Sequence, residues 1–230
     1  MINTGIGDIA FVIDTSGSMT GVFDYLIENL DNNLMQIQKK IKNFHEFDIR
    51  ISVVAGDRKK FFLIPFTGDL IKIASKLQFI KEHRSRANEI MCYGMDVALR
   101  DLDWRPEAKR IMVMITDEKL ETNYKPKKLK EYTKYEELKN RIEESDVILH
   151  FVTPLKCPDY KQLSEINGAI WYPIETTNEL MQVESIEKIF NVFIASIAKS
   201  MSSVANKISV KKYDDYIYHF PDTEIVRLDD

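Results

Sequence analysis

Residues 9–18 of the chain read IAFVIDTSGS. The first five form an unbroken apolar run, which is typical of a strand buried on both faces of a parallel sheet. The run ends in Asp14, and hydroxyl and glycine residues follow it directly. Because ligands of open α/β sheets bind beyond the carboxyl ends of the strands, this stretch predicts a central strand with a site at its end.

Helical and strand patterns alternate after this stretch. A helix that covers the sheet is predicted by apolar residues at spacings of three and four, namely Leu26, Leu30, Leu34, Ile37 and Ile41. Residues 49–55 and 61–64 flank a turn and predict a hairpin, and Pro65 predicts that its second strand lies at a sheet edge.

The remaining pattern continues the alternation. It predicts helices over 88–102, 129–142, 159–166 and 186–204, and strands over 110–116, 147–152 and 169–172. This order indicates an α/β fold: a doubly wound, mostly parallel sheet with one antiparallel edge strand and helices on both faces.

The length of 230 residues fits one large domain. We expect that domain to cover residues 1–206. Residues 207–230 depart from the helix-strand alternation, because apolar and aromatic side chains there recur at every second position. We therefore expect a C-terminal extended arm or hairpin that packs on the domain.

Composition excludes several classes of protein. Lys and Arg total 32 against 36 Asp and Glu, a net charge of −4, which does not provide the positive field of a general nucleic-acid binder. No basic segment precedes the first apolar run, and no apolar stretch approaches the ~18 residues of a membrane span. The two cysteines are far apart and do not favour a disulfide or zinc site. We expect a cytoplasmic protein that binds neither nucleic acid nor membrane.

The end of the first strand offers the ligands of a hard cation. Asp14, Ser16 and Ser18 supply one carboxylate and two hydroxyls at alternate positions, a set suited to Mg²⁺, with Mn²⁺ or Ca²⁺ as alternatives. A second carboxylate, Asp117, follows the apolar run over residues 111–115. If that run is a neighbouring strand, Asp14 and Asp117 face one ion.

These motifs resemble the von Willebrand factor A domain family. Its metal-ion-dependent adhesion site combines D-x-S-x-S, a threonine on a second loop and an aspartate in a T-D pair, and Asp14, Ser16, Ser18, Thr116 and Asp117 match. The resemblance extends to residues 94–99, to residues 103–106 and to the order of elements through about residue 204. It implies a binding module, not an enzyme, that captures a protein partner through an acidic side chain completing the metal's octahedron. It also suggests a bacterial system in which the partner is a MoxR-type ATPase, a kinase or a phosphatase.

The chain departs from the family at the second loop. The family's threonine position falls on or beside Glu89, with Asn88 and Ser85 as other oxygen donors. Glu89 is either a third carboxylate ligand, which weakens the ion's pull on an acidic partner, or a solvated residue in the first turn of a helix. In the latter case Asn88 or water fills the position.

A basic rim around this acidic centre is a further hypothesis. It is built from one run of lysines and from the second loop, namely Lys125, Lys127, Lys128, Lys130, Arg84 and Arg86. Such a rim would steer an acidic partner, whereas the ordinary interpretation of the lysine run is a solvated face.

Other interpretations of the D-T-S-G-S stretch are weaker. A strand-to-helix turn capped by Ser18 or Thr20 does not explain Asp117. An aspartic protease requires an all-β fold, and a phosphoaspartate transferase of the haloacid dehalogenase type requires Asp where Ser16 stands. Two alternatives stay open: a Mg²⁺-dependent hydrolase or phosphoryl-transfer enzyme that uses Asp14 and Asp117 with Glu89 or His83 as base, and a structural protein whose site binds no ion.

Overall fold

The sheet has the predicted architecture in a computed structural model, which describes residues 4–40, 46–84, 91–117, 128–155, 158–175, 183–201, 212–218 and 223–229. In these ranges seven strands form one sheet in the order β6-β5-β4-β1-β2-β3-β7. The strands are β1 (Thr4–Asp14), β2 (Glu46–Gly56), β3 (Lys60–Thr67), β4 (Lys109–Ile115), β5 (Val147–Pro154), β6 (Ile170–Ile174) and β7 (Glu224–Arg227). Only β2 and β3 pair antiparallel. The α/β fold class predicted from the sequence is confirmed.

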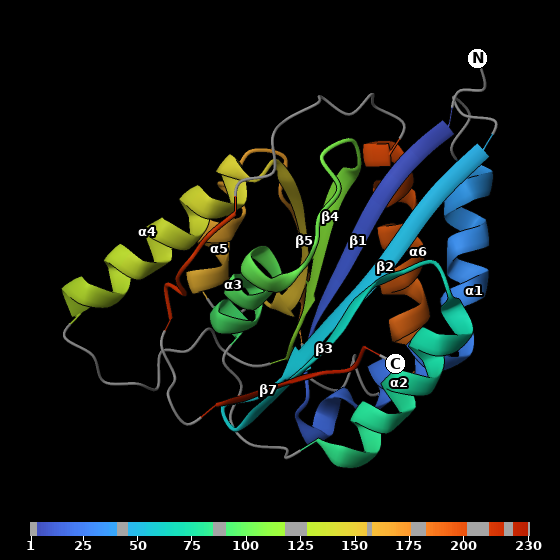
Figure 1. Cartoon of the computed structure of the whole chain (residues 1–230), viewed down its shortest axis with the longest axis horizontal. Helices are drawn as coiled ribbons and strands as arrows, with labels where there is room; N and C mark the ends of the chain where they lie inside the picture. Colours follow the sequence, from blue (N-terminus) through green and yellow to red (C-terminus); the bar gives the residue numbers. More distant parts are fainter. Residues whose placement is uncertain are drawn as a thin grey trace.

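Helices cover both faces of the sheet (Figure 1). One face carries α1 (Thr20–Lys40), α2 (Leu70–His83) and α6 (Val183–Met201). The other carries α3 (Met91–Asp101), α4 (Lys128–Glu144) and α5 (Pro158–Leu163). A short 3₁₀ turn, η1 (Gly17–Met19), joins β1 to α1. No helix in the described part of the chain is long and apolar enough to cross a membrane.

The central strand β1 supplies both cores. Ile9, Phe11 and Ile13 pack in the core under α1 and α6, while Ala10 and Val12 pack in the core under α3. Because successive side chains of a strand point to opposite faces, an unbroken apolar run is what a two-sided position requires. Complete burial of each large side chain contributes ~1.5–3 kcal/mol.

The edge position predicted for the second hairpin strand is wrong. β7 pairs with Lys60–Leu63 of β3 and forms the edge itself. Pro65 lies beyond the paired residues, so its missing N–H removes no hydrogen bond between β3 and β7.

One helix was absent from the sequence prediction. α2 buries Ile73, Leu77 and Ile80 at helical spacing, but Ile71 is 85% exposed and Phe79 is 41% exposed. These apolar side chains on the outer face obscure the amphipathic pattern that identifies a surface helix.

The C-terminal segment packs on α3 and α4. The buried carboxylate of Asp96 accepts hydrogen bonds from the N–H groups of Ile217 (2.6 Å) and Tyr218 (3.2 Å). Arg141 contacts both Asp96 (3.3 Å) and Asp215 (3.1 Å). The chain then returns as β7. The boundary predicted between residues 206 and 207 lies outside the described residues.

Candidate metal centre

The site begins where β1 and β4 end side by side. The two strands are parallel, and Ile13 pairs with Ile115, so the segments that start at Asp14 and Thr116 leave the sheet together. In Figure 1, η1 lies at this lower edge of the sheet, below the ends of β1 and β2. The topology therefore brings the two sequence motifs to one place, as parallel strands require.

Hydrogen bonds orient the central carboxylate. Asp14 is fully buried. Its Oδ1 accepts the N–H of Ser16 at 2.6 Å, and its Oδ2 accepts the hydroxyl of Thr116 at 2.8 Å. The first bond folds the loop back on the strand end, and the second ties that loop to the end of β4.

Ser16 connects the remaining candidate ligands. Its Oγ lies 2.9 Å from Ser18 Oγ and donates to Asp117 Oδ1 at 3.4 Å. The predicted ligands Asp14, Ser16, Ser18 and Asp117 therefore converge, although they come from two segments about a hundred positions apart. Ser16 makes no side-chain capping bond to η1. Its hydroxyl contacts Ser18 and Asp117 instead.

This arrangement fits a small, hard cation. Every converging donor is an oxygen, which Mg²⁺ prefers. Adjacent oxygens of an octahedron with ~2.1 Å bonds lie roughly 3.0 Å apart, and the two serine hydroxyls are 2.9 Å apart. Among the described residues no three His, Cys, Asp or Glu side chains form a metal cluster. The hydroxyls are therefore an essential part of the donor set.

Several predicted residues lie outside the described part of the chain. These are Glu89 with its alternatives Asn88 and Ser85, and the rim residues Arg86, Lys125 and Lys127. Lys128 and Lys130 lie in the first turn of α4. The third-ligand and lysine-rim hypotheses stay predictions.

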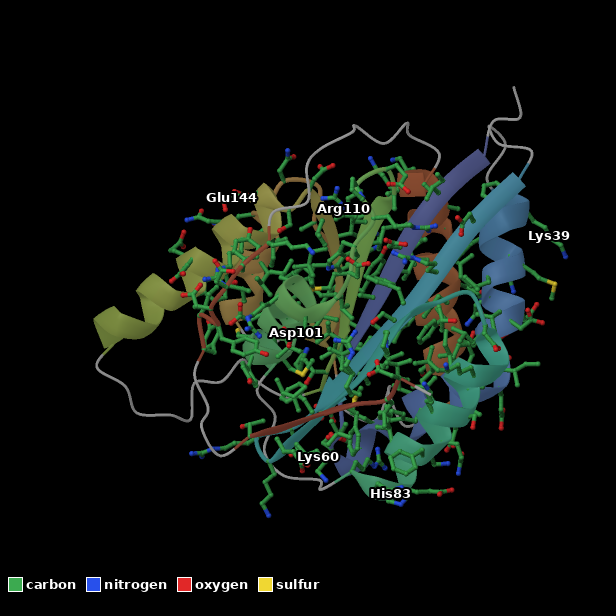
Figure 2. The ribbon with its side chains drawn as sticks, in the orientation of Figure 1. Lys39, Lys60, His83, Asp101, Arg110 and Glu144 are labelled. Carbon is green, nitrogen blue, oxygen red and sulfur yellow. The ribbon has the colours of Figure 1, made fainter. Side chains whose placement is uncertain are left out.

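Arg84 is not an exposed member of a basic rim. Its side chain is only 7% exposed and donates to the carbonyl of Ser16 (3.2 Å) and to Thr20 Oγ1 (2.6 Å). The neighbouring His83 is exposed and stacks on Phe79 with the ring centres 4.0 Å apart. Figure 2 labels His83 at the same lower edge of the molecule. The sequence predicted Arg84 on the rim because it lies next to the second loop, but its side chain is buried.

Sequence reasoning missed Asp57 as a support of the site. Gly56 pairs with Asp14, so Asp57 leaves β2 beside the metal loop. Its buried carboxylate accepts the hydroxyl of Thr15 at 3.1 Å and the N–H groups of Lys59 and Lys60 at 2.9 and 3.3 Å. The available signal was an Asp directly after a buried strand, the same signal that identified Asp14 and Asp117.

The loop geometry does not explain the glycine at position 17. It lies in η1 without a positive φ, and a Cβ at this position would have no heavy atom within 4 Å. Neither conformation nor space requires a glycine here.

Comparison with known families agrees with this geometry. Residues 9–119 match the family model described as von Willebrand factor type A domain. The matched range starts in β1 and extends just past Asp117, so it includes both carboxylates of the site. Residues 9–119 are therefore similar to a von Willebrand factor type A domain. Comparison with curated proteins gives no match.

Two solved structures of proximal thread matrix protein 1 from the mussel byssus are similar to this domain. One, in crystal form 2, has 12% identity and a TM-score of 0.52 over 84% of this chain and 46% of that one. The other, with a zinc-occupied MIDAS motif, has 13% identity and a TM-score of 0.55 over 83% and 46%. At these identities the likeness shows the fold alone. The chain spans just under half the length of these proteins.

Proposed function

We propose that the chain is a metal-dependent protein-protein interaction module. Asp14, Ser16, Ser18 and Asp117 would hold Mg²⁺, with Mn²⁺ or Ca²⁺ as alternatives. The observation that supports this most strongly is the position of Ser16, whose hydroxyl meets both Ser18 and Asp117 while its N–H fixes Asp14. A von Willebrand A domain with this donor set has the composition of a metal-ion-dependent adhesion site.

The donor set leaves room for a partner. Mg²⁺ takes six ligands in near-octahedral geometry, and the four side chains do not fill that shell if each contributes one oxygen. The ion would supply positive charge at the carboxyl edge of the sheet. An Asp or Glu of a partner would then complete the shell and form a charge-assisted contact.

The same geometry gives less support to an enzyme. Catalysis of hydrolysis or phosphoryl transfer by Asp14 and Asp117 needs a general base within reach of the reacting group. Among the described residues, Asp57 is directed to Thr15 and to the turn after β2, and His83 Nδ1 lies 2.8 Å from the carbonyl of Phe79. We therefore propose binding without turnover.

The class of partner rests on family resemblance. We propose a cytoplasmic bacterial role in which the domain binds a MoxR-type ATPase, a kinase or a phosphatase. This proposal follows the analogy with von Willebrand A domains and not the geometry of the site.

Capture of a partner with and without chelator tests the proposed function. The immobilised wild-type chain, Asp14→Ala and Asp69→Asn are each incubated with native lysate in Mg²⁺ or EDTA. Asp69 is exposed and caps α2 by accepting the N–H of Lys72, a bond that Asn can keep. We expect a partner that Mg²⁺ retains on the wild type and on Asp69→Asn, but that both EDTA and Asp14→Ala release.

Two outcomes would contradict the proposal. Capture that ignores both EDTA and Asp14→Ala would show that the metal edge is not the binding surface. Metal-dependent turnover of a phosphoester by the purified chain would instead favour the enzyme.

A further inference from the structure

We propose that Arg84 is a positioning residue of the metal centre: its guanidinium holds the Ser16 loop in the geometry that binds the ion. This inference rests on the proposed function and deepens it. It assigns to Arg84 a role in metal affinity in place of the partner contact expected from the sequence.

The backbone of Arg84 ends α2. Its N–H donates to the carbonyl of Ile80 at 2.9 Å and completes the last turn of α2. Its φ and ψ of −66° and 145° are extended, so the chain leaves the helix at this residue. The segment that follows is the one that contains Glu89. Arg84 therefore stands where α2 ends and the second predicted metal loop begins.

The side chain of Arg84 reaches the first metal loop. Nη1 donates to the carbonyl of Ser16 at 3.2 Å, and Nη2 donates to Thr20 Oγ1 at 2.6 Å. The guanidinium carbon lies 5.3 Å from the ring centre of Phe23, which supports it from α1. A planar fork can bond both acceptors in a fixed geometry, whereas the ammonium of a lysine is a compact point charge on a flexible stem.

These bonds constrain the residue at the middle of the donor set. Ser16 bonds Asp14 through its N–H, meets Ser18 and Asp117 through its hydroxyl, and accepts from Arg84 through its carbonyl. Thr20 donates in turn to the carbonyl of Gly17 at 2.7 Å. Arg84 thus fixes the loop at both of its ends, before and after Ser18. A ligand whose loop is fixed in advance costs less ordering entropy when the ion binds.

Arg84 affects the site through its positive charge as well as through its hydrogen bonds. A buried guanidinium bonded to the carbonyl of Ser16 places positive charge beside the donor set. With the ion bound, the same charge adds to the positive potential that an acidic partner meets. The positive charge of Arg84 by itself would weaken binding of a cation. A variant that keeps this charge but loses the guanidinium geometry should therefore lose metal affinity only if Arg84 positions the loop.

Arg84→Lys separates positioning from charge. The Mn²⁺ dissociation constant is measured by calorimetry for the wild type, Arg84→Lys and the matched control Arg110→Lys. Arg110 is 2% exposed and donates to the carbonyls of Ser145 (2.6 Å), Arg105 (3.2 Å) and Pro106 (3.1 Å). Figure 2 shows Arg110 and His83, the neighbour of Arg84, at opposite ends of the molecule.

We expect Arg84→Lys to weaken Mn²⁺ binding on the order of tenfold, the effect of losing one hydrogen bond to a charged group. Arg110→Lys should lower the thermal midpoint and leave the dissociation constant unchanged. Thr20→Val removes only the Nη2 acceptor and the bond to Gly17, and it should weaken Mn²⁺ binding several-fold. If Arg84→Lys fails to fold, as judged by circular dichroism, Thr20→Val decides the question.

The wild-type titration keeps the two claims distinguishable. No Mn²⁺ binding by the wild type would overturn the proposed function and, with it, the role of Arg84. Normal binding by the wild type together with unchanged binding by Arg84→Lys and Thr20→Val would overturn only this inference. Arg84 would then be a structural residue of the α2 terminus.

Discussion

Asp14 has two tasks at the scale of the single residue. It is a candidate ligand, and it is also the buried acceptor for the N–H of Ser16 and the hydroxyl of Thr116. An ionised carboxylate has about four lone-pair positions, so both bonds leave room for a metal. Removal of the side chain therefore affects the loop as well as the ion.

We predict that Asp14→Ala abolishes Mg²⁺ and Mn²⁺ binding and lowers the free energy of unfolding by ~1–3 kcal/mol. The loss of stability arises because the amide of Ser16 and the hydroxyl of Thr116 lose a buried acceptor. Calorimetry and urea unfolding in EDTA measure the two effects. Metal binding equal to that of the wild type would remove Asp14 from the site.

Glu89 tests how the charge of the site is set. As a third carboxylate it would strengthen the hold on the cation and reduce the residual positive charge offered to a partner. Glu89→Thr should then weaken metal affinity and tighten metal-dependent capture of an acidic ligand, as measured by calorimetry and by a binding assay. If both affinities fall together, Glu89 is a simple ligand or a residue needed for folding. If neither changes, it lies outside the coordination sphere.

At the scale of the element, buried runs made the strands and most of the helices predictable. β1 and β4 contain unbroken apolar runs over residues 9–13 and 111–115. α1 buries the predicted core positions Leu26, Leu30, Leu34 and Ile37, and the fifth, Ile41, lies outside the described residues. α2 was not predictable because Ile71 and Phe79 lie on its outer face. β7 has only four residues, none of them fully buried, and is fixed by its pairing with β3.

The residues of the site also divide into those that the sequence predicts and those that it does not. Asp14, Ser16, Ser18 and Asp117 were predictable because strand ends and short spacings are visible in sequence. The position of Asp57 after a strand was visible in the sequence, but its bond to Thr15, 42 positions away, was not. The bond of Arg84 to Ser16, 68 positions away, was not visible either. Periodicity and motif spacing carry no information on such contacts.

Close packing of α3 on β1 and β3 gives a prediction for Gly94. A Cβ there would lie 2.9 Å from Val12 Cγ1 and 3.0 Å from Phe61 Cε1. We expect Gly94→Ala to lower the free energy of unfolding by ~1–3 kcal/mol, the usual cost of an overpacked core. Gly17→Ala is the control, since a Cβ there meets nothing within 4 Å. Equal stability of the two variants in urea unfolding would contradict this packing.

His150 makes β5 sensitive to acid. It is fully buried and lies beside Tyr172, with the ring centres 6.3 Å apart, and burial lowers its pKa to about 4. The unfolded chain binds a proton with a pKa of 6.5, so the stability conferred by neutral His150 is complete above that pH and is lost as the pH falls toward 4.

We therefore predict that the wild type loses about 2 kcal/mol more stability than His150→Phe between about pH 7 and about pH 5. Urea unfolding at the two pH values measures the difference, and Phe preserves an aromatic ring beside Tyr172. His83→Gln, at an exposed position, should follow the wild type. Parallel pH profiles of the wild type and His150→Phe would show that His150 is not the sensitive group.

At the scale of the whole molecule, one sheet separates two cores and carries the site at its carboxyl edge. The C-terminal segment closes over α3 and α4 through Asp96 and Arg141, and β7 then adds to the opposite end of the sheet from β6. α3 therefore contacts the C-terminal segment at Asp96, and its first residue follows the segment that contains Glu89.

The most direct test of the metal centre is anomalous diffraction from crystals grown with Mn²⁺. We predict one strong anomalous peak at the end of β1, roughly 2.1 Å from Ser16 Oγ and Ser18 Oγ, with the carboxylates of Asp14 and Asp117 in its coordination shell. A peak elsewhere, or none at saturating Mn²⁺, would contradict it.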